Sequence, residues 1–310
     1  MILNVSGRTD ICAFYLDWFI NRLNEGYVYV RNPYYNKQVS KVILDDIDLI
    51  VFCTKNPIPL MKNLDKFEKY NLCVQVTITP YKKDIERNVL DKAKIIEAFK
   101  QISKRIGKEK MVLRYDPIFL SEKYNINYHK KAFEKLCVFL KDYLDHIIIS
   151  FLDEYKNVKE NKNALSYLKM NKEMIYTLAS TIGSIAKKYD IPVQACAEEY
   201  DFSSFGIKKE ACISEEYVKK ITGYNIVKNT KKSNRKYCTC IPSIDIGEYN
   251  TCPNLCAYCY ANYNEKEVLN RYKLHNKTSP VLTGNIVATD IIKLRKDVGY
   301  KKYNLNKKLE

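Results

Sequence analysis

Residues 146–152 read HIIISFL, a short apolar run that is rich in β-branched side chains. A continuous apolar run of this length is typical of a strand buried on both faces, as the strands of a parallel sheet are. The chain carries five more runs of this kind before residue 200: ILNVS (2–6), LIVFCT (49–54), CVQVTIT (73–79), MVLRY (111–115) and IPVQACA (191–197). We therefore expect six parallel strands.

Helical patterns lie between these runs, with apolar residues recurring every three or four positions over residues 84–107, 128–144 and 171–190. Alternating strands and helices favour either an open, doubly wound sheet or a β/α barrel. The glycine-rich phosphate loop of a dinucleotide-binding fold does not follow the first strand. We therefore predict an α/β fold of the TIM-like β/α barrel type.

The composition changes near residue 225, and three parts are expected. Residues 1–224 form the barrel core, a cysteine-rich segment at 225–264 completes the barrel, and residues 265–310 form a helix and a basic tail. Within these parts, KNTKKSNRK (228–236) is predicted to be a surface segment and NEKEVLNRYKLH (264–275) a helix. Residues 291–310 are predicted to be a partly docked basic tail with a solvated face.

Composition narrows the possible locations and partners. The 310 residues are 46% hydrophobic, enough for a sizeable core. No apolar run reaches the roughly 18 residues of a membrane helix, and MILNVSGRTDIC lacks the pattern of a secretion signal. We expect a cytoplasmic protein whose eleven cysteines serve metal or redox chemistry, without a membrane partner. The net charge of +16 predicts a nucleic-acid partner, unless a general lysine bias explains it.

Polar residues cluster directly after the predicted strands. In a barrel, the carboxyl ends of the strands surround one cavity, where barrel enzymes build their sites. We predict that Arg114 and Asp116 are catalytic, because an apolar strand leads straight into this charged pair and Pro117 stiffens it. Alternatively, strand ends are polar simply because they meet solvent. The predicted substrate-binding residues are Lys55, Asp153 and Glu198.

The stretch CPNLCAYC (252–259) carries the most specific chemical signal. Three thiolates, from Cys252, Cys256 and Cys259, suit three irons of a [4Fe-4S] cluster and leave the fourth iron open. The CxxxCxxC pattern, with the aromatic Tyr258 before its last cysteine, resembles the signature of the radical SAM superfamily. A zinc site built from Cys256 and Cys259 together with Cys238 and Cys240 is the alternative.

The resemblance to the radical SAM superfamily implies a cofactor and a reaction. The open iron would bind the amino and carboxylate groups of S-adenosylmethionine (SAM), and an electron would split its sulfonium to a 5′-deoxyadenosyl radical. A reductase, or a flavodoxin or ferredoxin, would supply that electron. The rival hypothesis is a non-enzymatic module, stabilised by zinc or iron–sulfur, that binds nucleic acid through its basic surface.

Four further cysteines fall in the second half of the chain: Cys196, Cys212, Cys238 and Cys240. Four thiolates suffice for a second, fully ligated [4Fe-4S] cluster, which we predict here. Taken singly, each is equally typical of a buried structural cysteine.

Several segments together resemble the DUF1848 family, a group of bacterial and archaeal proteins of uncharacterised function. They are SGRTDICAFY (6–15), VYVRNPYYNKQVSKV (28–42), VFCTKNP (51–57), RYDPI (114–118), SFLDEY (150–155) and the cysteine-rich stretch from Cys238 to Asn262. Cys12 and Cys53 depart from the family pattern, which has proline and tryptophan there, and we interpret both as small buried residues. The resemblance implies iron–sulfur binding and a barrel, but no substrate. A similarity to spore photoproduct lyase is more distant.

The cysteine loop comes late in the chain, whereas in most radical SAM enzymes it follows the first barrel strand. We therefore predict a circularly permuted radical SAM barrel, in which IPSIDIGEY (241–249) is a late strand beside ILNVS (2–6). The loop from Ser6 to Asp10 would then bind SAM. Thr9 and Asp10 would accept hydrogen bonds from its ammonium group, and Arg8 would pair with its carboxylate. Alternatively, Arg8 and Asp10 pair with each other to close a turn.

Overall fold

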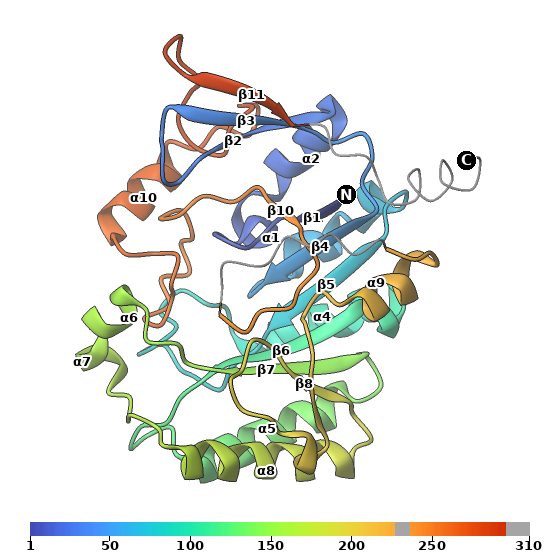
Figure 1. Ribbon diagram of the computed structural model, residues 1–310, viewed down its shortest axis with the longest axis vertical. Coiled ribbons are helices and arrows are strands. Elements are labelled where there is room, and N and C mark those ends of the chain that lie inside the picture. Colours follow the sequence, from blue (N-terminus) through green and yellow to red (C-terminus); the bar gives the residue numbers. More distant parts are fainter. Residues whose placement is uncertain (227–235, 296–310) are drawn as a thin grey trace.

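A computed structural model describes residues 1–226 and 236–295 (Figure 1). Its centre is an eight-stranded sheet in which all neighbouring strands are parallel. All six predicted strands lie in it, so the α/β prediction is confirmed. In sheet order the strands are β10 (Ile244–Asp245), β1 (Ile2–Asn4), β4 (Leu49–Thr54), β5 (Leu72–Thr77), β6 (Met111–Ile118), β7 (His146–Phe151), β8 (Val193–Ala195) and β9 (Ile207–Lys209).

The sheet winds in one direction. From β1 through β4 to β9, each strand of this sheet lies beside the next one in the chain, and β10 then returns to the free side of β1. From β1 to β9 the order therefore does not reverse, as it would at the switch point of a doubly wound sheet. The order is the one a β/α barrel would have. Within residues 1–226 and 236–295, however, no ladder joins β9 to β10, so the sheet is open there.

The predicted late strand is present, although it is short. Residues Ile244 and Asp245 of β10 pair in parallel with Leu3 and Asn4 of β1. This pairing joins the beginning of the chain to the segment just before the cysteine loop.

Helices cover the outer face of the sheet, and α5 and α8 run side by side along the bottom of the view in Figure 1. The predicted helix over 84–107 begins only at residue 92, because the Asp91 carboxylate accepts a hydrogen bond from Ala93 N at 2.8 Å and caps the helix there. The α-helices are α1 (Ile11–Phe14), α2 (Leu16–Glu25), α3 (Ile58–Lys62), α4 (Lys92–Ile106), α5 (Ile126–Leu140), α6 (Lys156–Glu160), α7 (Lys162–Leu165), α8 (Lys172–Lys188), α9 (Glu215–Thr222) and α10 (Glu265–Lys273). Short 3₁₀ turns lie at η1 (Leu64–Phe67), η2 (Lys108–Lys110) and η3 (Ser203–Phe205).

Alternate residues of each strand face opposite sides of the sheet. Buried apolar side chains cluster on both sides. In β4, Ile50 and Phe52 join the main core under the helices, whereas Leu49 and Val51 join a smaller cluster on the inner face. That inner cluster is covered by Tyr217, Val218 and Ile221 of α9 and by Ile241. Parallel strands buried on both faces explain why the sequence shows continuous apolar runs.

A second sheet of three strands lies at the top of the view in Figure 1, in the order β11 (Ile291–Arg295), β3 (Gln38–Ile43), β2 (Tyr27–Arg31). Residues 291–295, predicted as part of a solvated tail, pair in parallel with β3 but keep exposed side chains. Most of the predicted basic segment 228–236, and the rest of the tail, lie outside the described residues. Among the described helices, none combines the length and apolar character needed to cross a membrane.

Candidate metal centres at the strand ends

The CxxxCxxC loop is held by side chains from other parts of the chain. Tyr15 donates its hydroxyl hydrogen bond to the Thr251 carbonyl at 2.5 Å, and Ala257 N donates to the Ile85 carbonyl at 2.9 Å. Three asparagine side chains donate to carbonyls within the loop: Asn88 to Pro253 at 2.8 Å, Asn157 to Cys259, and Asn161 to Ala257 at 2.8 Å. These bonds fix the backbone and leave the thiols to other partners.

The three thiols of this loop are free and close enough to influence one another. Burial raises the pKa of Cys256 to about 12 and also raises that of Cys259. The pKa of Cys252 is raised too, by burial and by the nearby Asp10 and the other two thiols. Although clustered, the three sulfur atoms do not all lie within 4.8 Å of one another. Such thiols stay protonated until a metal ion displaces their protons.

A buried ion network borders Cys256. Glu86, which is 1% exposed, accepts hydrogen bonds from Lys55 Nζ at 2.6 Å and from Thr79 Oγ1 at 2.6 Å. It also pairs with Lys92 and accepts the Tyr258 hydroxyl. Burial alone would raise the pKa of Glu86, but the two lysines outweigh it and lower the pKa to about 2. One carboxylate and two ammonium groups leave a positive charge beside the cysteine loop.

The predicted SAM-binding loop, residues 6–10, lies against the cysteine loop. Asp10 accepts hydrogen bonds from Asn254 Nδ2 at 3.3 Å, Lys55 N at 2.8 Å and Ala13 N at 3.0 Å. Its carboxylate is therefore already occupied, and burial raises its pKa.

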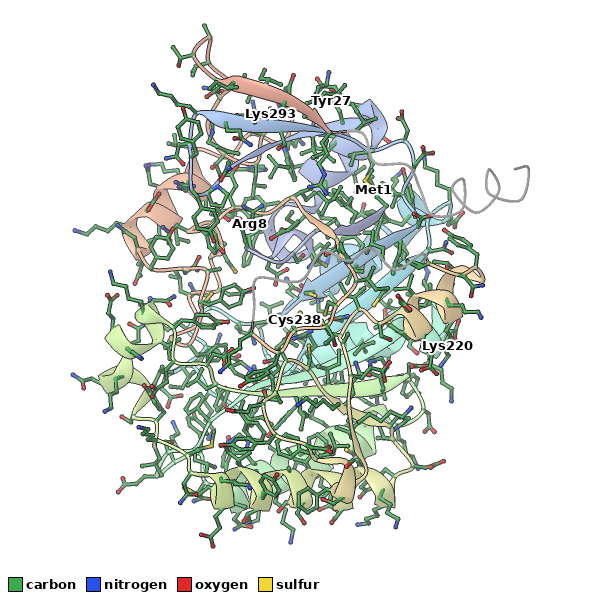
Figure 2. All side chains as sticks on the ribbon, in the orientation of Figure 1. Met1, Arg8, Tyr27, Lys220, Cys238 and Lys293 are labelled. Carbon is green, nitrogen blue, oxygen red and sulfur yellow. The ribbon has the colours of Figure 1, made fainter. Side chains whose placement is uncertain are left out.

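Arg8 does not pair with Asp10, so the alternative turn is not formed. Its guanidinium donates instead to the Asp245 carboxylate at 2.9 Å and to the Asp245 carbonyl at 3.0 Å, which ties the loop to β10 (Figure 2). The buried hydroxyls of Ser6 and Thr9 have no hydrogen-bond partner.

The predicted catalytic pair lies on the inner face of the sheet. Arg114 donates from Nε to Asp116 at 3.1 Å and from Nη1 to Gln75 at 2.8 Å, and Ser150 donates to the other Asp116 oxygen. Burial opposes the charge of Arg114, but Asp116 and nearby thiols outweigh it and raise its pKa. This polar layer lies towards the strand ends, above the apolar inner cluster.

The second cysteine set gathers at the same inner face. The sulfur atoms of Cys196, Cys212 and Cys240 all lie within 4.8 Å of one another, and the Cys212 and Cys240 sulfurs are 3.3 Å apart. Hydrogen bonds from Cys196 and Cys240 lower the pKa of Cys212. Cys238 lies near the middle of the molecule in Figure 2, and its thiol contacts that of Cys240. Cys240 thus groups with these cysteines and not with Cys256 and Cys259.

Two predicted substrate-binding residues form hydrogen bonds with groups other than the cysteines. The Glu198 carboxylate accepts a hydrogen bond from Phe151 N at 2.8 Å and so supports the end of β7. Asp153 is exposed and accepts a hydrogen bond from the Tyr155 hydroxyl at 3.2 Å. The third, Lys55, reaches the cysteine loop through Glu86.

Two residues of the site, Glu86 and Gln75, were not predicted from the sequence. Glu86 lies in DIER, which was assigned to a helix, and Gln75 lies within an apolar strand. A lone polar residue inside a buried run was the available signal for Gln75, because such a residue needs a specific partner.

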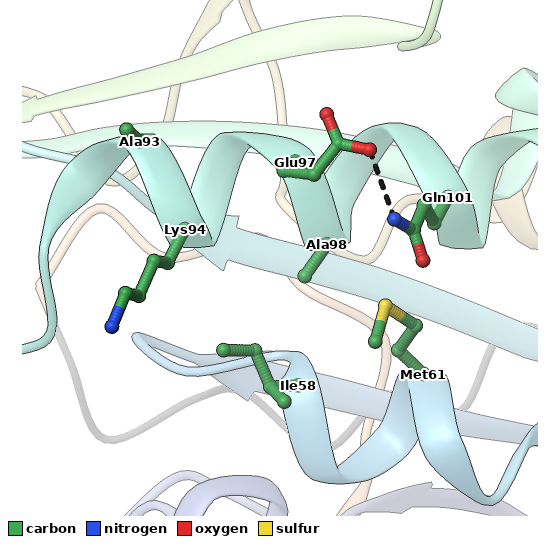
Figure 3. Close-up of a pocket in the computed structure, with 7 residues that line it drawn as sticks. All are labelled: Ile58, Met61, Ala93, Lys94, Glu97, Ala98 and Gln101. Atoms are coloured by element: carbon green, nitrogen blue, oxygen red, sulfur yellow. Dashed lines mark hydrogen bonds between the residues drawn. The ribbon is translucent and has the colours of Figure 1, made fainter.

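Two depressions on the surface are lined by none of the predicted site residues. One of about 320 Å³ is lined by Ile58 and Met61 of α3 and by residues of α4, among them the hydrogen-bonded Glu97 and Gln101 (Figure 3). None of the predicted site residues lines it.

Comparisons with known proteins place the chain in a family. Among solved structures it is similar to a putative alpha-L-fucosidase from Bacteroides thetaiotaomicron VPI-5482, at 15% identity over 73% of this chain and 81% of that one, with a TM-score of 0.25. An endoglucanase shares 9% identity over 72% of this chain and 96% of that one, also with a TM-score of 0.25. No curated protein matches the chain. The family described as "Domain of unknown function (DUF1848)" matches residues 2–261, and the chain therefore belongs to the DUF1848 family.

Proposed function

We propose that this protein is a radical SAM enzyme acting on a substrate not yet identified. The observation that carries the proposal is that Cys252, Cys256 and Cys259 lie on one loop, close enough for their thiols to influence one another, beside the ends of the parallel strands. Their donor set suits the group, because thiolates are the ligands of iron–sulfur clusters and three of them leave one iron open. When bound, the [4Fe-4S] cluster would supply the electron that splits SAM to a 5′-deoxyadenosyl radical.

The surrounding residues have distinct roles in this proposal. Glu86 holds Tyr258 and Lys55 in place, and the excess positive charge of the two lysines offsets negative charge at the thiolates. Ser6 and Thr9 would bind the polar groups of SAM through their unpartnered hydroxyls. Asp10 and Arg8 act as positioning residues, because their polar atoms already bind neighbours on the cysteine loop and β10.

Arg114 and Asp116 would contact the substrate on the inner face, with Gln75 and Ser150 orienting them. A reductase, or a flavodoxin or ferredoxin, would deliver the electron. The pairing of β10 with β1, directly before the cysteine loop, supports the reading of the fold as a circularly permuted radical SAM barrel, with β10 in the place of the usual first strand. The second cysteine set is proposed as a further metal site in the same interior.

Anaerobic reconstitution with iron and sulfide tests the proposal. The parent protein should turn brown and, with a reductant, convert SAM to 5′-deoxyadenosine, whereas Cys256→Ala should lose this activity. Cys137→Ala is the matched control, because Cys137 is equally buried but lies on α5 in the outer core. Unchanged cleavage by Cys256→Ala would refute the assignment.

The rival, a non-enzymatic nucleic-acid-binding module, makes the opposite prediction. A colourless protein that holds only zinc and binds RNA or DNA would support it. We propose that any affinity for nucleic acid is nonspecific and falls steeply with salt, because lysine contacts to phosphate release counterions. Salt-insensitive binding to a single sequence would contradict this.

A further inference from the structure

The distances between the sulfur atoms of the second cysteine set indicate what the set binds. Cys196, Cys212 and Cys240 place their sulfur atoms within 4.8 Å of one another, with 3.3 Å between Cys212 and Cys240. The Cys238 thiol forms a hydrogen bond with that of Cys240. Three thiols therefore meet at one point of the inner face, and the Cys238 thiol contacts one of them.

Their spacing fits one ion better than a cluster. Four thiolates around a tetrahedral zinc, at Zn–S distances of about 2.3 Å, stand about 3.8 Å from one another. In a cubane each thiolate binds its own iron at a separate corner, so the sulfurs must spread further apart. The CxxxCxxC loop provides an internal contrast, because its three sulfurs do not all fall within 4.8 Å.

The ligands come from both sides of the opening in the large sheet. Cys196 directly follows β8 and Cys212 follows β9, whereas Cys238 and Cys240 precede β10. Across this opening, Ile241 N donates a hydrogen bond to the Ile213 carbonyl at 3.0 Å. An ion bound by all four cysteines would add strong bonds at the same place, between edges that no strand ladder joins in the described part of the chain.

The neighbouring groups suit a negatively charged centre. Four thiolates around a divalent ion carry a net charge of about −2, which needs support in a buried site. The Arg114 guanidinium forms a hydrogen bond with the Cys212 sulfur, and Gln75 Nε2 donates to the Cys212 carbonyl at 2.9 Å. Both side chains hold the Cys212 ligand in place.

We propose that Cys196, Cys212, Cys238 and Cys240 hold a single tetrahedral Zn²⁺ ion, which fastens the β9 side of the sheet to β10. Its role is structural, since four protein ligands leave no open position. This replaces the second [4Fe-4S] cluster predicted from the sequence, and it stands independently of the chemistry proposed for the CxxxCxxC loop.

Metal analysis of the full chain tests the proposal. After anaerobic reconstitution in the presence of zinc and iron, we expect about one zinc and about four irons per chain. In a variant with Cys252, Cys256 and Cys259 all changed to serine, the iron should disappear and the zinc should remain. X-ray absorption at the zinc edge should show four sulfur neighbours at about 2.3 Å.

Three results would overturn it. About four irons and a cubane spectrum in the triple variant would identify a second cluster. A triple variant without any metal, or one with a Cys212–Cys240 disulfide under reducing conditions, would refute metal binding at this set. Because the triple variant lacks the CxxxCxxC thiols, each outcome is independent of whether the parent cleaves SAM.

Single variants locate the ion. Cys240→Ser should lose the zinc and melt at a lower temperature. The matched control is Cys53→Ser, because Cys53 lies on the same inner face outside the set, and serine preserves its contact with Gln75. If Cys240→Ser fails to fold, removal of zinc from the triple variant with a chelator gives the same comparison. Unchanged stability after zinc loss would refute the structural role.

Discussion

Glu86 connects four side chains that lie far apart in the sequence. Its carboxylate binds Lys55, Lys92, Thr79 and Tyr258, and Tyr258 belongs to the cysteine loop. A buried carboxylate with two ammonium partners is costly to disrupt, because the charges left behind lose their compensation. The contacts place Glu86 at the structural centre of this part of the site.

Replacing Glu86 with glutamine should therefore destabilise the fold strongly. We expect a loss of about 3 kcal/mol in the free energy of unfolding, measured by urea titration at pH 7. Glu265→Gln is the control, since its ion pair with Arg87 is about half exposed and should contribute about 1 kcal/mol or less. Equal effects of the two substitutions would show that the buried network does not hold the loop.

His129 makes the stability of the protein depend on pH. It is 1% exposed and lies between the Tyr115 hydroxyl and the Phe119 carbonyl, and burial lowers its pKa to about 4. The unfolded chain, with an ordinary histidine pKa near about 6.5, binds a proton first as the pH falls. Stability from this residue is therefore complete above about pH 6.5 and is lost progressively towards pH 4.

The expected loss between pH 7.5 and pH 5 is about 2 kcal/mol from this residue alone. Urea unfolding of the parent and of His129→Gln at both pH values measures it, because the variant lacks the titrating group. The variant should lose less stability than the parent over this interval. An identical loss in both proteins would show that folding does not lower the pKa of His129.

At the scale of elements, Gly183 allows α8 to pack closely against η3, because glycine has no side chain. A Cβ at Gly183 would lie 2.1 Å from the Phe205 carbonyl oxygen in η3. An alanine in the middle of a helix usually stabilises it by about 1 kcal/mol relative to glycine. Here the backbone must move to make room.

Gly183→Ala should accordingly destabilise the protein by about 2 kcal/mol. The control is Ser184→Ala, one position along the same helix, where the side chain is exposed and alanine should be neutral or mildly stabilising. Thermal melts of both variants give the comparison. A stabilising effect of Gly183→Ala would mean that α8 does not pack this closely.

The elements show which features a sequence reveals. The six strands that lie in apolar runs of five to seven residues were predictable, because burial on both faces leaves a continuous signal. β9, with the sequence IKK, is too short for any periodicity, and only its partner in the sheet fixes it. β10, with the sequence ID, is also too short for periodicity, and a strand was predicted there only because the cysteine loop of a radical SAM barrel follows a strand. The loop before α4 was assigned to a helix because its apolar spacing fits one, whereas the Asp91 cap starts the helix later.

The sequence predicted several residues of the site, but it did not predict which side chains contact one another. The strand-end positions of Arg114 and Lys55 followed from the alternating pattern. The pairing of Arg8 with Asp245 joins residues 237 positions apart, and no local signal in the sequence indicates such a partner.

At the scale of the whole molecule, residues after 224 share the core of the residues before them, as expected for a segment that completes the predicted barrel. Ile244, Ile246, Tyr258 and Leu282 belong to the same buried core as the strands and helices before them. A fragment of residues 1–224 should therefore lack a cooperative unfolding transition, whereas the full chain should unfold in one step. Differential scanning calorimetry distinguishes them, and a sharp transition in the fragment would show that the first part folds by itself.

The pairing of β10, which comes late in the chain, with β1 also has a consequence for biosynthesis. On the ribosome, β1 emerges before β10 and has no β10 beside it until residues 244 and 245 have been made. The cysteine loop emerges later still. The nascent chain therefore leaves one sheet edge unpaired through most of its translation, and it needs protection from misassembly in that interval. Because the cysteine loop follows β10 in the chain, any metal centre that this loop holds can form only after both strands of the pair have been made.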